Sequence, residues 1–162
     1  MPTLTSRQNP IVARFRAAAR RDSPDVLLLD GAHLVGEALD AGLVLHEVAI
    51  TAGASPGDEI ASLVDRAERR GVTVSVVSSA VMDALSPVRS PSAVVALAER
   101  PVHGVADVYG EAPLVVVAVD VQDPGNLGAI VRVAEAGGAT GVVCAGVGAD
   151  PFGWKALRGS MG

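Results

Sequence analysis

The chain has 162 residues, of which 49% are hydrophobic and 19% are charged, and its formal net charge is −5. This composition can build a core and is too apolar for intrinsic disorder. The sequence contains no apolar run of the roughly 18 residues that a membrane span needs and no signal-peptide pattern, and a single cysteine, Cys144, excludes an intrachain disulfide framework and a multi-cysteine zinc site. We therefore expect a soluble, cytoplasmic α/β protein.

Residues 1–100 carry alternating helix and strand signals. The predicted helices cover 8–21, 33–41, 60–71 and 80–85, and the predicted strands cover 26–29, 45–51, 72–77 and 93–98. Thr5-Ser6 and Ser79 are the expected N-caps of the first and last of these helices. The order of the elements predicts a compact α/β domain of about 100 residues.

The second half of the chain begins with a different pattern. Residues 101–113 are polar, contain Gly and Pro and lack periodicity, which is typical of a linker. Residues 114–119 and 141–145 are continuous apolar runs, typical of parallel strands that are buried on both faces. A helix is predicted over 126–137 between them, and another begins at Trp154. Because two such strands do not make a stable sheet alone, we expect the native protein to continue beyond Gly162 or these strands to pair with a partner.

Positive charge is concentrated at the N-terminus. The first 21 residues carry +5 and the remainder carries −10, from the five arginines Arg7, Arg14, Arg16, Arg20 and Arg21 and from an excess of acids after them. A basic helix on an acidic body indicates contact with a polyanion, and a solvated helix without a partner is the alternative. Four aromatic residues are too few for RNA recognition by rows of stacked rings.

The most informative segment is 119–139, which is predicted to be a strand, a tight loop and the start of a helix. Pro124-Gly125 makes the turn, Asn126 is the expected helix cap, Gly128 permits close backbone approach, and Arg132 lies six residues into the helix. Helix N-termini at the carboxyl ends of parallel strands bind anions and nucleotides, and an Arg there can hold a phosphate or polarise a hydroxyl. The alternative is a capping Asn beside a surface Arg.

This segment resembles a known family. Asp123-Pro-Gly-Asn-Leu-Gly-Ala-Ile-Val-Arg-Val-Ala-Glu-Ala-Gly-Gly-Ala is similar to the first motif, D-P-x-N-x-G-x-x-x-R-x-A-x-x-x-G-A, of the SpoU-type (TrmH-like) RNA ribose 2′-O-methyltransferases of the SPOUT superfamily. Three segments are similar to the family's substrate-binding domain: Ser6-Arg-Gln-Asn-Pro-Ile-Val, Leu29-Asp-Gly-Ala-His-Leu-Val-Gly-Glu-Ala-Leu and residues 79–98. In the last of them, Pro91-Ser92-Ala93 stands where the family often has Pro-Gln-Gly. Lys155-Ala-Leu-Arg-Gly-Ser-Met-Gly resembles its K-x-x-R-x-S-x-G segment.

The resemblance implies an RNA substrate-binding domain over 1–100, a linker over 101–113, and over 114–162 the first part of a trefoil-knot methyltransferase domain. It implies methyl transfer from S-adenosylmethionine to a ribose 2′-hydroxyl in rRNA or tRNA, by a protein that is a homodimer at full length and binds neither membrane nor DNA. Arg132 and Asn126 match the family's catalytic positions, and Arg158 and Ser160 match substrate-contacting ones. We further expect Arg7, Arg14 and Arg16 to contact RNA phosphates.

The family's later motifs, a Gly-Asn-Glu-Gly loop and a Ser-Leu-Asn-Val-Ser helix start, are not found in the sequence. The resemblance places the knot and the cofactor pocket in them, so we expect the 162 residues alone to be inactive. A non-catalytic RNA-binding module is the alternative function. Three other sites are disfavoured: Gly146-Val-Gly148 lacks the rest of a dinucleotide fingerprint, the three histidines lack metal-ligand spacing, and Cys144 reads as a packed core thiol rather than a nucleophile.

Overall fold

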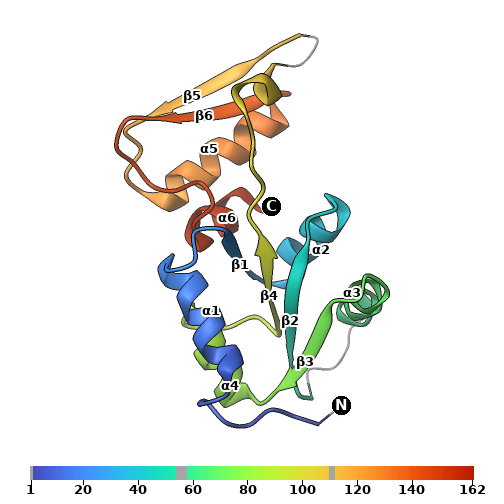
Figure 1. The fold of residues 1–162 in the computed structure, drawn as a ribbon. Coiled ribbons are helices and arrows are strands. Elements are labelled where there is room, and N and C mark those ends of the chain that lie inside the picture. The colour runs from blue at the N-terminus through green and yellow to red at the C-terminus, as the bar shows by residue number, and fades with distance from the viewer. Residues whose placement is uncertain (1, 54–57, 110–111) are drawn as a thin grey trace. The chain divides into compact units, whose positions relative to one another are not determined.

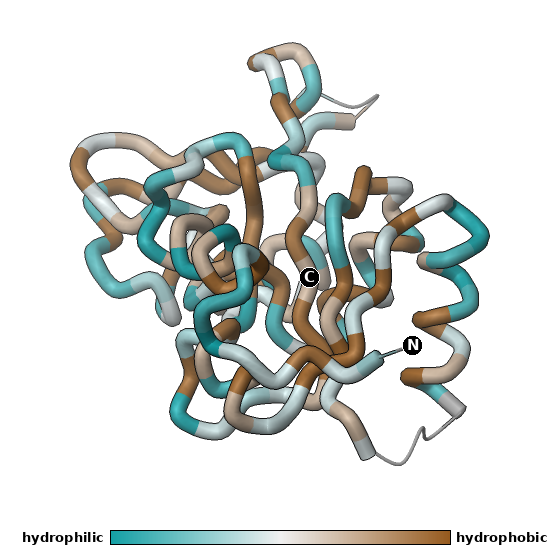
Figure 2. The backbone as a smooth tube through the Cα atoms, turned by 60° about the horizontal axis from the view of Figure 1, so that its bottom comes forward, coloured by the Kyte–Doolittle hydropathy of each residue, from teal (hydrophilic) through white to brown (hydrophobic). Residues whose placement is uncertain are grey.

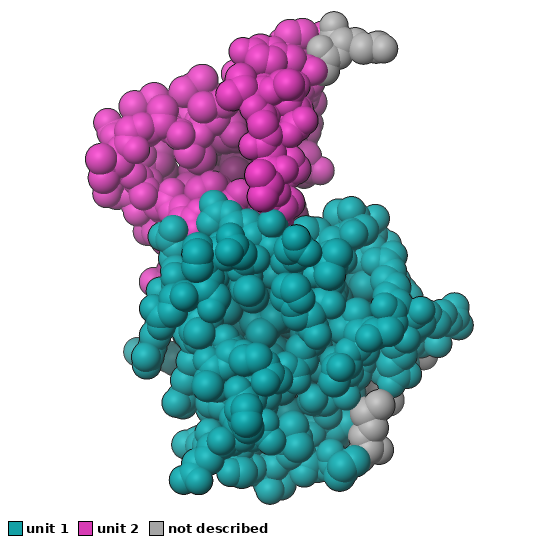
Figure 3. All heavy atoms as spheres, in the orientation of Figure 1, with its two compact units in different colours: residues 1–100 teal, residues 101–162 magenta. Residues whose placement is uncertain are grey.

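A computed structural model describes residues 2–53, 58–109 and 112–162. The chain forms two compact units, residues 1–100 and residues 101–162, which are coloured separately in Figure 3. Both units combine helices with a β-sheet, which confirms the predicted α/β class. In the described residues, no helix is both long enough and apolar enough to cross a membrane.

Unit 1 is built on a four-stranded sheet with the order β1-β4-β2-β3. The strands are β1 (Val26–Asp30), β2 (Leu45–Thr51), β3 (Thr73–Val77) and β4 (Val94–Glu99), and the helices are α1 (Pro10–Arg20), α2 (Ala32–Asp40), α3 (Asp58–Arg69) and α4 (Ser79–Leu85). β2 and β3 are parallel, while β4 runs antiparallel to both of its neighbours. Helices α1 and α4 lie on one face of the sheet and α2 and α3 on the other (Figure 1).

The core of unit 1 lies on both faces of this sheet. Strand β4 is central, and five successive residues from Val94 to Ala98 are buried. Helix α1 contributes Ile11, Val12 and Phe15, of which Phe15 is completely buried. Figure 2, coloured by residue hydropathy, shows brown apolar stretches alternating with teal polar stretches along the chain. The helices therefore supply the cover that the apolar strands require.

Three helix caps differ from the predicted ones. The side chain of Asn9, not of Thr5 or Ser6, accepts a hydrogen bond from the Ile11 N–H and caps α1. Ser78 rather than Ser79 caps α4, with its hydroxyl accepting from the Val81 N–H. Pro10 explains the first shift, because proline is favoured at the first helical position and a cap must precede it. The third difference, at α5, concerns the candidate site.

Unit 2 contains a sheet of two parallel strands, β5 (Val115–Val119) and β6 (Gly141–Ala145). Its helices are α5 (Pro124–Ala136) and α6 (Trp154–Ser160), and the 3₁₀ helix η1 (Val105–Val108) lies within the expected linker. The paired register joins Val117 to Val143, and both side chains are exposed. The prediction that Cys144 is buried in the core is wrong: the residue is exposed, because β6 has only one neighbouring strand among the described residues.

Candidate functional site

The N-terminus of α5 lies directly after the carboxyl end of β5. Asp123 is its N-cap, and the Asp123 Oδ1 accepts a hydrogen bond of 2.8 Å from the Asn126 N–H. The expectation that Asn126 is the cap is therefore wrong, since Asn126 lies within the first helical turn. The sequence carried the signal for the true cap, because an Asp followed by Pro fits the N-cap and first helical positions. Asn126 is exposed, and its side chain is not required to cap the helix.

Glycines let α5 and α6 approach very closely. A Cβ atom built on Gly128 would overlap the Ala156 carbonyl oxygen and lie 2.8 Å from the Gly159 Cα. A Cβ atom built on Gly159 would lie 3.0 Å from the carbonyl oxygen of Gly125. The backbones of the two helices are therefore in direct contact near the N-terminus of α5, and no larger residue fits at Gly128 without moving one helix.

The four unit 2 residues of the predicted site lie on this helix pair. Arg132 follows Gly128 by four residues, so it occupies the α6-facing side of α5 one turn further on, where its side chain is exposed. Ser160 is 7% exposed at the end of α6, and its hydroxyl donates to the Leu157 carbonyl oxygen at 2.9 Å. Arg158 is exposed in the last turn of α6. The helix contact thus joins helices whose site residues are separated by more than 25 positions in the sequence.

The basic segment is part of α1 and the loop before it, in unit 1. Arg7 Nε donates to the Ala80 carbonyl oxygen at 2.8 Å, and Arg16 Nε donates to the Ala84 carbonyl oxygen at 3.3 Å. Both acceptors belong to α4, so these arginines fasten the basic segment to the helix beside it. Each bond uses one of the five N–H donors of a guanidinium, and both side chains are exposed.

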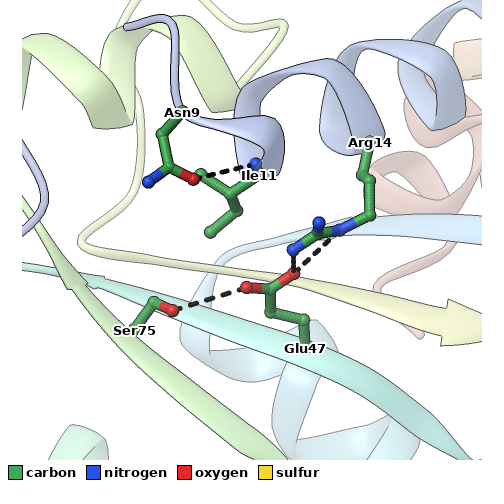
Figure 4. Close-up of polar contacts among 5 residues, drawn as sticks. All are labelled: Asn9, Ile11, Arg14, Glu47 and Ser75. Carbon is green, nitrogen blue, oxygen red and sulfur yellow. Dashed lines mark hydrogen bonds and ion pairs between the residues drawn. The ribbon is translucent and has the colours of Figure 1, made fainter. Parts of the chain in front are cut away.

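Arg14 differs from the other two arginines in pairing with a carboxylate. Its Nε and Nη2 donate to Glu47 Oε2 on β2 at 3.2 and 2.5 Å, while the hydroxyl of Ser75 donates to Glu47 Oε1 at 3.4 Å (Figure 4). The Glu47 side chain is only 10% exposed. A buried carboxylate needs a compensating charge, and Arg14 supplies it. Sequence reasoning missed this pair, because nothing in the local pattern indicates that a strand acid faces α1.

The remaining titratable residues suggest no metal site. Within the described ranges, no group of three or more His, Cys, Asp or Glu residues is placed to hold a metal ion. His33 Nδ1 lies 3.9 Å from Glu37 Oε1 within α2, and His103 Nδ1, before η1, lies 3.9 Å from Asp107 Oδ2; the side chains of both pairs are exposed. Partial burial, and secondarily the Asp150 carboxylate, raises the pKa of the Cys144 thiol.

The chain is similar to known proteins over its whole length. Residues 1–108 match the family described as thiostrepton-resistance methylase, N terminus, and residues 113–162 match the SpoU rRNA methylase family. The chain is 32% identical to an uncharacterized tRNA/rRNA methyltransferase of Synechocystis, with 99% of the chain and 58% of that protein covered. It is 29% identical to the 23S rRNA (guanosine(2553)-2′-O)-methyltransferase RlmP of Bacillus subtilis, with 92% and 55% covered.

A solved structure extends this similarity to the fold. The AdoMet-bound rRNA methyltransferase of Sinorhizobium meliloti superposes with a TM-score of 0.83 at 30% identity, over 99% of this chain and 60% of that one. The chain therefore spans somewhat more than half the length of the relatives it matches. Both units are matched, and unit 1 is matched in full by the thiostrepton-resistance methylase family. The chain belongs to the SpoU-type, TrmH-like family of RNA methyltransferases.

Proposed function

We propose that the full-length protein methylates a ribose 2′-hydroxyl in structured RNA, rRNA or tRNA. The observation that carries the proposal is the glycine contact between α5 and α6, which brings the family-matched residues of both helices to one place. The similarity to RNA methyltransferases, one of them named as a 2′-O-methyltransferase, supports it. The similarity to an AdoMet-bound structure supports S-adenosylmethionine as the cofactor.

The residues of unit 2 have separate roles in this proposal. A guanidinium group donates hydrogen bonds and has no acceptor site for a proton, so Arg132 is not proposed as a general base. Its guanidinium instead stabilises the negative charge that develops on the 2′-oxygen, or holds the adjacent phosphate, which takes up the proton. Asn126, at the positive end of the α5 dipole, orients the ribose through its amide. Arg158 contacts a phosphate, and the buried hydroxyl of Ser160 shapes the site beside the substrate.

When bound, S-adenosylmethionine would supply a methyl group that its sulfonium activates for transfer without a metal. The resemblance places its pocket after the segment that contains Ser160, so we assign the cofactor to no residue of this chain. The same resemblance supports a homodimer at full length. Both proposals concern the full-length protein, since this chain spans 58% and 55% of the two relatives.

Unit 1 is proposed to bind the RNA. Arg7 and Arg16 are fixed through Nε to α4 carbonyl oxygens, so their charged ends are presented with little loss of side-chain entropy. The positive charge of Arg14 is offset by its salt bridge with Glu47, so Arg14 contributes less to phosphate binding. Phosphate contacts of this kind hold the RNA in register and carry no base specificity.

The test is methyl transfer by the full-length protein from methyl-labelled S-adenosylmethionine to rRNA and tRNA transcripts. A methylated 2′-oxygen cannot attack the neighbouring phosphate, so we expect label in alkali-resistant dinucleotides. Label in alkali-labile mononucleotides would place the methyl group on a base and refute the ribose assignment. RNA binding without label in any fraction would favour the non-catalytic module.

A further inference from the structure

We propose that Asp120 is a positioning residue that clasps the two loops carrying the candidate site. The first loop, residues 120–123, joins β5 to α5, and the second, residues 146–150, leads from β6 toward α6. The inference rests on the proposed function for its catalytic consequence. Its structural content concerns unit 2 alone.

The backbone of Asp120 has an uncommon conformation. Its φ is 52°, in the left-handed region that side chains other than Gly, Asn and Asp rarely adopt. Its N–H donates to the Ala145 carbonyl oxygen at 3.0 Å, which continues the pairing of β5 with β6. Conformations of this kind persist only where the surrounding contacts fix them, and they are concentrated at functional sites.

The side chain of Asp120 uses this conformation to reach the second loop. Its Oδ1 accepts a hydrogen bond of 2.8 Å from the Val147 N–H. The carboxylate lies directly against Gly146, where a built Cβ would overlap Oδ1 and lie 2.9 Å from Cγ. Gly146 has a φ of 77°, so both its conformation and its missing side chain are needed for the contact.

Further hydrogen bonds join the two loops just after Asp120. The Ala149 N–H donates to the Val121 carbonyl oxygen at 2.8 Å, and the Gln122 side-chain amide donates to the Val147 carbonyl oxygen. A Cβ atom on Gly148 would lie 2.7 Å from that same Val121 oxygen. Residues 120–122 and 146–149 are therefore held together by several contacts, with the Asp120 carboxylate as an acceptor at one end.

Each loop ends at one helix of the candidate site. Asp123, one residue beyond Gln122, caps α5 and bonds the Asn126 N–H. Asp150 follows Ala149 and accepts from Gly153, the residue before α6. The glycine contact fixes how near the helices lie, and the clasp fixes where each one starts. Asp120 therefore controls the position of Asn126 relative to Ser160 without contacting substrate.

The first test is amide hydrogen exchange of the ¹⁵N-labelled 162-residue chain carrying Asp120→Ala or Asp120→Asn. In Asp120→Ala we expect exchange at Val147 to rise about tenfold, the size of one missing hydrogen bond, and to rise also at Asn126 and Leu157. Asp120→Asn keeps an acceptor and tolerates the left-handed conformation, so its exchange should stay within about threefold of the parent. Asp107→Ala is the matched control, because it removes another exposed Asp-to-backbone bond of unit 2, at Gly104.

Two exchange patterns would overturn the proposal. A rise confined to Val147 in Asp120→Ala would make the contact a local bond with no effect on the helices. An even rise over all of unit 2 in both variants, with β5 and β6 included, would make Asp120 a general stability residue. The amides of unit 1 provide an internal reference that neither variant should change.

The second test is methyl transfer by the full-length protein. We expect Asp120→Ala to lower kcat at least tenfold, with about threefold or less change in KM for RNA, and Asp120→Asn to restore most of kcat. An unchanged kcat, or an effect on KM alone, would refute a positioning role. If the parent protein transfers no methyl group, the proposed function fails, and the exchange patterns still decide whether Asp120 positions the helices.

Discussion

The sheets of the two units both contain apolar strands, but they differ in how far those strands are buried. In unit 1 the central strand β4 is buried from Val94 to Ala98, because helices lie on both faces of a four-stranded sheet. In unit 2 the two strands β5 and β6 are equally apolar, yet Val117 is 57% and Val119 is 60% exposed. An apolar run therefore predicts a strand in both units and says nothing of whether the residues around it suffice to bury it.

The two units also differ in the kind of contact that stabilises them. Unit 1 depends on side chains packed around a sheet, as the buried Phe15 and Val95 show. Unit 2 depends more on backbone contact, with α5 and α6 touching through Gly125, Gly128 and Gly159. The candidate site lies on that backbone contact. Substitutions at glycine should therefore damage unit 2, and substitutions of large apolar residues should damage unit 1.

The largest effect is expected for Gly128→Ala. The added methyl group would overlap the Ala156 carbonyl oxygen, so we expect unit 2 to lose about 1–3 kcal/mol of unfolding free energy. Urea unfolding followed by the fluorescence of the single Trp154, which begins α6, measures unit 2 selectively. Gly36→Ala in α2, followed by amide exchange in unit 1, is the matched control, because its methyl group would lie 3.6 Å from Leu63 Cδ2 and should raise the stability of unit 1 by about 0.5–1 kcal/mol. Equal effects from the two changes would contradict the backbone-contact account.

A second pair compares the same substitution on the two sheets. Val95→Ala in β4 removes a completely buried side chain and should cost about 2 kcal/mol. Val117→Ala in β5 removes a largely exposed one and should change stability by less than about 0.5 kcal/mol. Amide exchange in β4 measures the first change and Trp154 fluorescence the second. Comparable decreases in stability would mean that the exposed face of unit 2 is covered in solution.

The comparison also applies to RNA binding, which we assign to unit 1. Replacing Arg7 and Arg16 together by Ala should lower the slope of log affinity against log salt by about 1 for each phosphate that is no longer bound. Arg14→Ala should have a smaller effect on binding, because Glu47 already shares its charge. Arg69→Ala on α3, which removes an exposed arginine paired with Asp65, is the control. An unchanged salt slope in the double variant would exclude phosphate binding by these two arginines.

The smallest effect concerns Cys144 in unit 2. Its pKa is raised by partial burial and by Asp150, so at a given pH below that pKa the folded chain holds less thiolate than the unfolded chain. Iodoacetamide should therefore alkylate the folded protein more slowly at pH 8, with the difference shrinking as pH rises. Asp150→Asn should speed alkylation of the folded form. Faster reaction of the folded parent would contradict the direction of the shift.

Local sequence signals predicted the elements and missed the contacts between them. The bounds of β2 and β6 agree with prediction to the residue, because β-branched apolar residues and nearby glycines mark them. The caps at Asn9 and Asp123 were missed although each precedes a Pro, a signal that outweighs the nearby Ser and Asn. The exposure of Cys144 depends on how many strands adjoin β6, which a strand's own residues do not encode.

Prediction of the candidate site was limited in the same way. The motif located Asn126 and Arg132 on one helix, and Gly128 was expected to permit close approach. That the approaching backbone belongs to α6, through Gly159, is a tertiary fact. The pairing of Arg14 with Glu47 and the clasp at Asp120 likewise join residues more than 20 positions apart. Such pairs follow from packing and not from spacing.

The most direct measurement is alkali-resistant methyl incorporation by the full-length protein with Arg132 intact or changed to Ala. If Arg132 stabilises charge on the 2′-oxygen, Arg132→Ala should lower the methylation rate by at least about 100-fold. RNA affinity, measured in the same preparation, should change by no more than about threefold, because the phosphate contacts proposed for Arg7, Arg16 and Arg158 remain. Methylation by the variant at the parent rate would contradict the assignment of the active site to α5.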